Sequence, residues 1–108
     1  MLDLEIAALQ LSNQLQSGAE LVLLDVREPW EVATARIEGA KNIPMGEIAS
    51  RVFQELDPEK HIVVYCHSGI RSMNAAVWLR SQGFGKAQSL RGGVDAWSRE
   101  IDPKVPRY

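Results

Sequence analysis

One segment sets the fold class of this chain: Ile62-Val63-Val64-Tyr65-Cys66-His67-Ser68-Gly69-Ile70-Arg71-Ser72. Its first four residues are apolar and rich in β-branched side chains, which is typical of a strand buried on both faces. The residues that follow Ser72 include two alanines and end at Gly83, which predicts a helix from Ser72 to about Gln82. A buried strand that leads through a short loop into a helix indicates an α/β arrangement.

The rest of the chain repeats this alternation. Strands are expected at 21–24, 40–43 and 87–90, with an edge strand near 4–7. Helices are expected at 12–17 with Ser12 as the cap, at 28–35, at 46–56, and after Gly92-Gly93. Strands that alternate with helices predict a sandwich around a mostly parallel sheet of about five strands.

The composition of the chain excludes several classes of protein. With 108 residues there is room for one domain, which we expect to span 1–108. The net charge of -2 argues against a nucleic-acid-binding surface. No apolar stretch is long enough to cross a bilayer, and the N-terminal residues lack the features of a signal peptide. A cytoplasmic protein without nucleic-acid or membrane partners is therefore expected.

Cys66 is the single cysteine of the sequence. Because a disulfide needs two cysteines, an internal disulfide is excluded, and a single cysteine fits a reducing compartment. A lone cysteine is either an inert buried residue or a nucleophile, and its neighbours must decide between the two. His61 and His67 do not complete a zinc set with it, because three or four convergent ligands are needed, so no metal site is expected.

The neighbours of Cys66 favour the nucleophile. Cys66 and Asp25 both follow expected strands, and ligands of parallel sheets bind beyond the carboxyl ends of strands. The N–H groups at a helix N-terminus favour a thiolate, and a tight loop directs successive N–H groups inward around an anion. Gly69 can adopt the positive φ that such a loop requires, and Arg71 adds a permanent cation. The segment therefore predicts a site for a thiolate and for a negatively charged adduct on it.

The six residues Cys66–Arg71 resemble the active-site loop of the rhodanese family. Three further segments resemble signatures of the same family in the same order: 23–28, 37–44 and 90–97. The resemblance extends along almost the whole chain and implies a rhodanese-like three-layer sandwich with the activity of a thiosulfate sulfurtransferase.

The mechanism that the resemblance implies is a double displacement at Cys66. The thiolate takes the outer sulfur of a small anionic donor such as thiosulfate and holds it as a persulfide, which cyanide, a thiol or a protein then removes. The resemblance places the sulfur in a cradle of backbone N–H groups and assigns Arg71 to orienting the donor or holding the loop. It implies no metal or organic cofactor. The substrate-binding residues are then His67, Ser68, Gly69, Ile70 and Arg71.

Two features outside the loop also bear on function. Asp25 and Arg27 either line the pocket or pair with each other to brace the loop, and the bracing role is favoured. The tail at 99–108 resembles the end of rhodanese domains fused to enzymes that activate ubiquitin-like sulfur carriers. This resemblance implies a sulfur-carrier protein as one candidate acceptor.

Two other functions remain open from the sequence. The low-molecular-weight cysteine phosphatases and arsenate reductases of related fold also use a cysteine–arginine loop. Their loops place five residues between cysteine and arginine, whereas four stand between Cys66 and Arg71. The second alternative is a non-catalytic regulatory rhodanese module, although inactive relatives usually lose the cysteine.

Overall fold

The computed structural model of the chain describes residues 2–108, in which five parallel strands form one sheet. The strands are β1 (Glu5–Ile6), β2 (Val22–Asp25), β3 (Lys41–Asn42), β4 (Ile62–Tyr65) and β5 (Ala87–Leu90). They lie in the order β1-β5-β4-β2-β3, and each neighbouring pair is parallel. The expected α/β class and parallel sheet are confirmed, and each strand overlaps its expected range.

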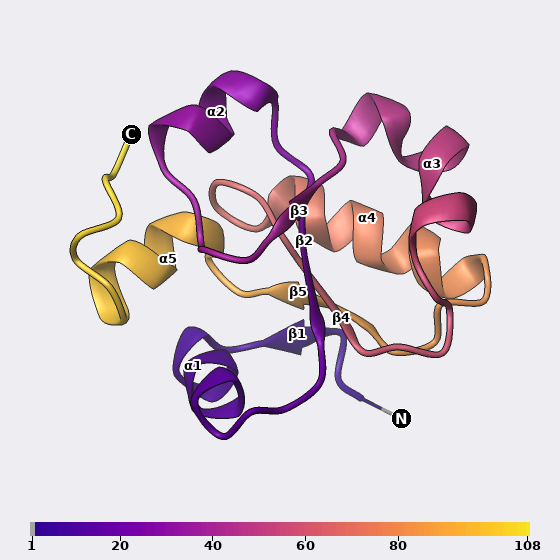
Figure 1. Ribbon diagram of the computed structural model, residues 1–108, viewed down its shortest axis with the longest axis horizontal. Helices are drawn as coiled ribbons and strands as arrows, with labels where there is room; N and C mark the ends of the chain where they lie inside the picture. Colours follow the sequence, from indigo (N-terminus) through magenta and orange to yellow (C-terminus); the bar gives the residue numbers. More distant parts are fainter. Residues whose placement is uncertain (1) are drawn as a thin grey trace.

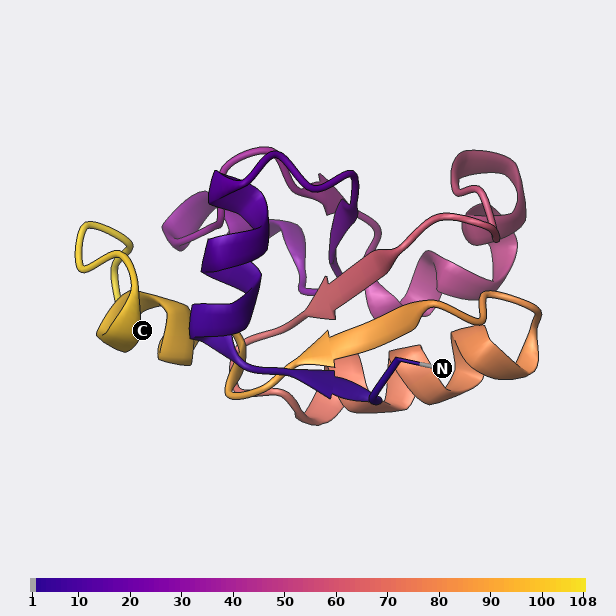
Figure 2. The same cartoon turned by 90° about the horizontal axis from the view of Figure 1, so that it is seen from below.

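Helices connect the strands and cover the sheet (Figures 1 and 2). They are α1 (Ala8–Gln16), α2 (Pro29–Thr34), a 3-10 turn (Met45–Glu47), α3 (Ile48–Glu55), α4 (Ile70–Ser81) and α5 (Gly93–Glu100). None of the helices in residues 2–108 has the length and apolar character needed to span a membrane.

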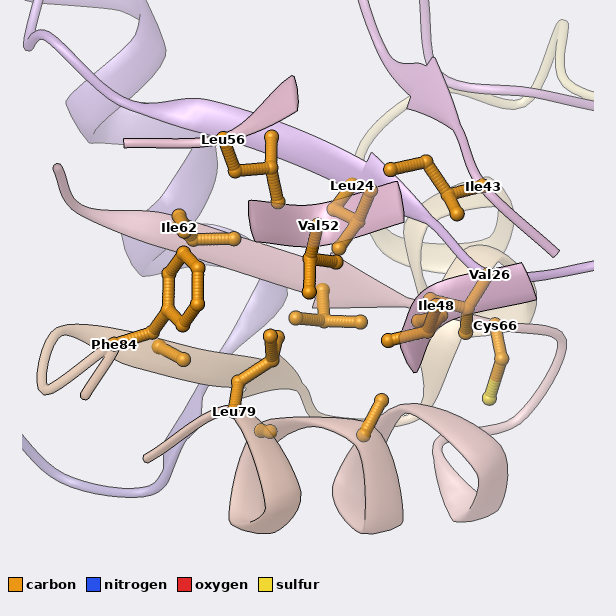
Figure 3. Packing of buried hydrophobic residues seen from close by; sticks show 14 residues of the cluster. Leu24, Val26, Ile43, Ile48, Val52, Leu56, Ile62, Cys66, Leu79 and Phe84 are labelled. Atoms are coloured by element: carbon orange, nitrogen blue, oxygen red, sulfur yellow. The ribbon is translucent and has the colours of Figure 1, made fainter. Parts of the chain in front are cut away.

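The side chains of β4 alternate between two buried clusters, one on each face of the sheet. Ile62 and Val64 pack with residues of α3 and α4, whereas Val63 and Tyr65 pack with residues of α1 and α5. Two helical layers therefore enclose the sheet, which is the expected three-layer sandwich. Figure 3 shows Cys66 at one end of the α3–α4 cluster, directly after β4.

Three expected helix boundaries were wrong. Helix α1 begins at Ala8, and Ser12 is a buried residue in its middle, because Ala8 and Leu11 already face the core. The segment expected as one helix at 46–56 is a 3-10 turn followed by α3. Helix α4 begins at Ile70 and not at Ser72, which brings its N-terminal turn directly against Cys66.

The N-terminus of α5 packs against the loop that follows β4. The N–H groups of Val94 and Asp95 donate to the carbonyl oxygens of Cys66 and His67 at 2.9 and 3.1 Å. Gly93 lies between these contacts with φ +61°, and a Cβ atom there would approach both carbonyl oxygens to 2.5 Å. The close approach of two backbones therefore requires glycine at this position.

Replacing Gly93 by alanine is expected to lower the free energy of unfolding by about 2 kcal/mol, because the side chain adds a backbone clash to an unfavourable φ. Urea unfolding of the variant measures this loss. Gly85→Ala is the matched control, since a Cβ atom at Gly85 meets nothing within 4 Å. Equal stability of the two variants would contradict the inferred contact.

Candidate active site

Cys66 lies at the carboxyl end of β4 and is 1% exposed. Its Sγ accepts hydrogen bonds from the N–H groups of Gly69 at 3.1 Å and Ser72 at 3.4 Å. The hydroxyl of Ser72 lies 3.4 Å from the same sulfur and 2.8 Å from Ser89 Oγ. The thiol donates to Ser72 Oγ, and the Ser72 hydroxyl donates to the carbonyl oxygen of Gly69 at 3.2 Å. The donors that stabilise negative charge on the sulfur are therefore the two backbone N–H groups.

The loop between Cys66 and α4 curls around this sulfur. Gly69 caps α4 with φ +110°, as the sequence predicted for this position. The first turn of a helix has N–H groups without intrahelical acceptors, and here this turn contains Ile70, Arg71 and Ser72. The positive end of the helix dipole thus points at the position of the sulfur. This arrangement suits a thiolate and a further anionic sulfur bonded to it.

Arg71 does not stand as a free cation beside the sulfur. Its Nη1 and Nη2 donate to the two carboxylate oxygens of Glu31 at 2.7 and 2.8 Å. Glu31 comes from α2 and is 4% exposed, while the Arg71 side chain is 37% exposed. The Glu31 carboxylate raises the pKa of Arg71, and the nearby Cys66 sulfur adds to this effect. The loop arginine is thus held in a bidentate ion pair.

Asp25 and Arg27 form a second ion pair, which is almost fully buried. Arg27 donates from Nε and Nη2 to the Asp25 carboxylate at 2.9 and 2.7 Å. It also donates to the carbonyl oxygens of Glu31 and Ala35. These contacts join the end of β2 to the first turn and the C-terminal end of α2. Asp25 and Arg27 therefore pair with each other, and the bracing role of this pair stays a prediction.

Tyr108 connects the two ion pairs. Its hydroxyl accepts a hydrogen bond from Arg27 Nη1 at 2.8 Å and donates one to Glu31 Oε2 at 2.7 Å. Its ring stacks on that of His67, with 4.0 Å between ring centroids. We call Asp25, Arg27, Glu31, Arg71 and Tyr108 the ion-pair cluster.

The structure therefore brings most of the expected site residues together. Gly69 donates to Cys66 Sγ, Arg71 pairs with Glu31, and the ring of His67 stacks on that of Tyr108. The side chains of Ser68 and Ile70 are exposed, Ile70 by 74%. Among residues 2–108, no group of three or more His, Cys, Asp or Glu side chains is placed to hold a metal ion.

Neither Glu31 nor Tyr108 was expected as a site residue from the sequence. Glu31 is the third residue of a helix that begins with proline, where a carboxylate has an ordinary capping role, and its Oε1 does accept the N–H of Glu28. The resemblance of the tail at 99–108 to fused rhodanese domains pointed toward the segment that carries Tyr108, but not toward this contact.

Because Glu31 is paired with Arg71, we expect the protein to lose stability in acid. Hydrogen bonds from Arg71 lower the pKa of Glu31 to about 2, against the opposing effect of burial. A carboxyl group whose pKa is lowered in the folded state stabilises the fold at pH values above its ordinary pKa, near 4.5. This stabilisation is lost as the pH falls toward the folded-state pKa of about 2. We therefore compare the free energies of unfolding of wild type and Glu31→Gln at two pH values. Wild type should be more stable than the variant at pH 7, and this difference should be smaller at pH 3. Chemical denaturation at both pH values measures the difference, and a pH-independent gap would contradict it.

Comparison with known proteins places these features in a family. A model of the rhodanese-like domain matches residues 7–100, a range that includes Asp25, Glu31 and the whole cysteine loop. The chain belongs to the rhodanese family. A sulfurtransferase of Allochromatium vinosum is 39% identical over 101 residues, which are 94% of each chain. The putative sulfurtransferase YtwF of Bacillus subtilis is 42% identical over 100 residues, covering 93% of this chain and 95% of YtwF.

Solved rhodanese structures share the same architecture. The human single-domain sulfurtransferase TSTD1 superposes with a TM-score of 0.80 at 27% identity, covering 91% of this chain and 97% of TSTD1. The chain also matches part of a longer protein, the probable adenylyltransferase/sulfurtransferase MoeZ of Mycobacterium tuberculosis. The identity there is 36% over 100 residues, covering 92% of this chain and 26% of MoeZ. Fold and relatives together support a sulfurtransferase of the rhodanese type.

Proposed function

We propose that this chain moves a sulfane sulfur from a small anionic donor such as thiosulfate to a thiophilic acceptor, with Cys66 as the carrier. The observation that carries the proposal is the position of Cys66 Sγ, which accepts the N–H groups of Gly69 and Ser72 at the start of α4. A nucleophilic cysteine needs a stabilised thiolate, and helix N–H groups supply that stabilisation without a metal.

The first step forms a persulfide on Cys66. The thiolate attacks the outer sulfur of thiosulfate, an S–S bond forms to Cys66, and the S–S bond of the donor breaks. Sulfite leaves with the electron pair of the broken bond, and the negative charge of the former thiolate now lies on the terminal sulfur. Backbone N–H groups at 67–71 stabilise that anionic sulfur, as an oxyanion hole stabilises oxygen.

The second step returns the thiolate. Cyanide, a thiol or a protein nucleophile attacks the terminal sulfur, and the S–S bond breaks with its electron pair on Cys66. A ubiquitin-like sulfur carrier is the proposed protein acceptor of a different kind, supported by the match to one part of MoeZ and by the tail at 99–108. There the terminal sulfur of the persulfide attacks the activated carboxyl terminus of the carrier and displaces its activating group. A thiol then cleaves the S–S bond at Cys66, which leaves a thiocarboxylate on the carrier and a mixed disulfide that a second thiol reduces. The cytoplasm is the proposed setting, because a thiol that must cycle through a persulfide needs reducing surroundings.

Intact mass spectrometry without reductant tests the proposal. The protein is incubated with thiosulfate in one sample and with the persulfide of a small thiol in another, and cyanide is added afterwards. We expect a mass gain of one sulfur atom that cyanide reverses. Absence of this gain with both donors would contradict sulfur transfer.

Two observations weigh against the cysteine phosphatase alternative. The loop holds four residues between Cys66 and Arg71, and the guanidinium that would bind a phosphate is already paired with Glu31. We therefore expect no turnover of an aryl phosphate that depends on Cys66. A non-catalytic module is less well supported, because the cysteine and its hydrogen-bond donors are all present.

A further inference from the structure

The ion-pair cluster leaves no unpaired arginine within it. Both Nη atoms of Arg71 are bound to Glu31, and Arg27 is bound to Asp25 by Nε and Nη2. In each pair one positive charge faces one negative charge at less than 3 Å. The net charge of the cluster is therefore close to zero, although two arginines lie in it.

Glu31 is held firmly in this position. Its Oε1 accepts the N–H of Glu28 in addition to Arg71, and its Oε2 accepts the hydroxyl of Tyr108. Glu31 is 4% exposed, so a dissolved anion competes poorly with its carboxylate for the guanidinium. A donor that reaches Cys66 consequently meets Arg71 as one half of a pair and not as a free cation.

We infer that Glu31 determines which sulfur donors this site accepts. By occupying the guanidinium of Arg71, it disfavours a dianion such as thiosulfate relative to a donor with one negative charge, such as a small-thiol persulfide. The inference rests on the proposed sulfur transfer and adds to it a residue that sets specificity through Arg71. Glu31 is thus a positioning residue and does not touch the reacting sulfur.

The physical reason is the difference in charge between the donors. Removal of one negative charge close to the site lowers the electrostatic energy of a bound dianion about twice as much as that of a bound monoanion. Release of Arg71 also frees two N–H donors in a geometry that suits an anionic oxygen pair. Thiosulfate has such oxygens, whereas an alkyl persulfide has none.

The test compares steady-state kinetics of wild type and Glu31→Gln with thiosulfate and with 2-mercaptoethanol persulfide. Glutamine keeps the shape of Glu31 and removes its charge. We expect KM for thiosulfate to fall about tenfold with little change in kcat, and KM for the persulfide to change less than about threefold. Glu31→Asp retains the charge and should keep the wild-type preference. A residue with only a structural role would not lower KM for thiosulfate while leaving KM for the persulfide nearly unchanged.

Glu38→Gln is the matched control. It removes the same unit of charge from an exposed carboxylate that pairs with Arg36, so both KM values should remain at the wild-type level. An equal fall in KM for thiosulfate in this variant, or no fall in Glu31→Gln, would overturn the inference. Absence of sulfur transfer by wild type with both donors would instead contradict the proposed function.

Wild type alone provides a second measurement if Glu31→Gln does not fold. KM for thiosulfate should change less than about twofold when the ionic strength is raised from low to physiological values, because no uncompensated cation attracts the donor. A rise of tenfold would overturn the inference, since it would mean that the dianion meets a free positive charge.

Discussion

Replacing Cys66 by serine is expected to reduce sulfur transfer by about a thousandfold or more, because a hydroxyl cannot accept and release sulfur as a thiolate does. The variant should also gain no sulfur atom in intact mass spectrometry with either donor. Cys66 is the only cysteine of the sequence, so no other thiol can replace it as nucleophile.

Serine at position 66 is also the control for folding. Its hydroxyl can accept the same N–H groups, and we expect the free energy of unfolding to remain within about 1 kcal/mol of wild type. An inactive but stable variant thus separates chemistry from structure. Retention of sulfur uptake by this variant would contradict the role of Cys66 and with it the proposed mechanism.

Replacing Arg27 by methionine is expected to lower the free energy of unfolding by about 3–5 kcal/mol, because Asp25 would remain buried without its partner. Asp25 is 1% exposed and Arg27 is fully buried. The carbonyl oxygen of Ala35 and the hydroxyl of Tyr108 would each lose a donor as well. Chemical denaturation measures the loss, and a variant that does not fold agrees with the same expectation.

Arg36→Met is the matched control for this substitution. Arg36 is exposed and pairs with the exposed Glu38, so its loss should change stability by about 0.5 kcal/mol or less. Arg27→Lys should lie between the two, because lysine keeps the charge but not the bidentate geometry. A loss of less than about 1 kcal/mol in Arg27→Met would contradict the bracing role of the buried pair.

Structural elements that depend mainly on neighbouring residues were predicted correctly from the sequence. The β-branched run at 62–65 predicted a buried strand, and β4 is buried at every position. Gly69 was expected in a positive-φ position because only a tight curl joins that strand to the following helix, and it caps α4 there. Helix starts were less accurate. Tertiary packing of Ala8 and Leu11 extends α1 beyond the cap that Ser12 suggested.

The sequence by itself therefore determined the fold class, the strand–loop–helix around Cys66 and the expected nucleophile, because period, turn residues and helix caps act over a few neighbours. Only the tertiary structure decided what surrounds Arg71. Glu31 reaches it from 40 residues away, and Tyr108 reaches Glu31 from 77 residues away. No periodic pattern links positions so far apart, and a carboxylate at the start of a helix already has a local explanation. Their pairing arises because the parallel sheet brings the loop after β4 next to α2, where the tail closes over both.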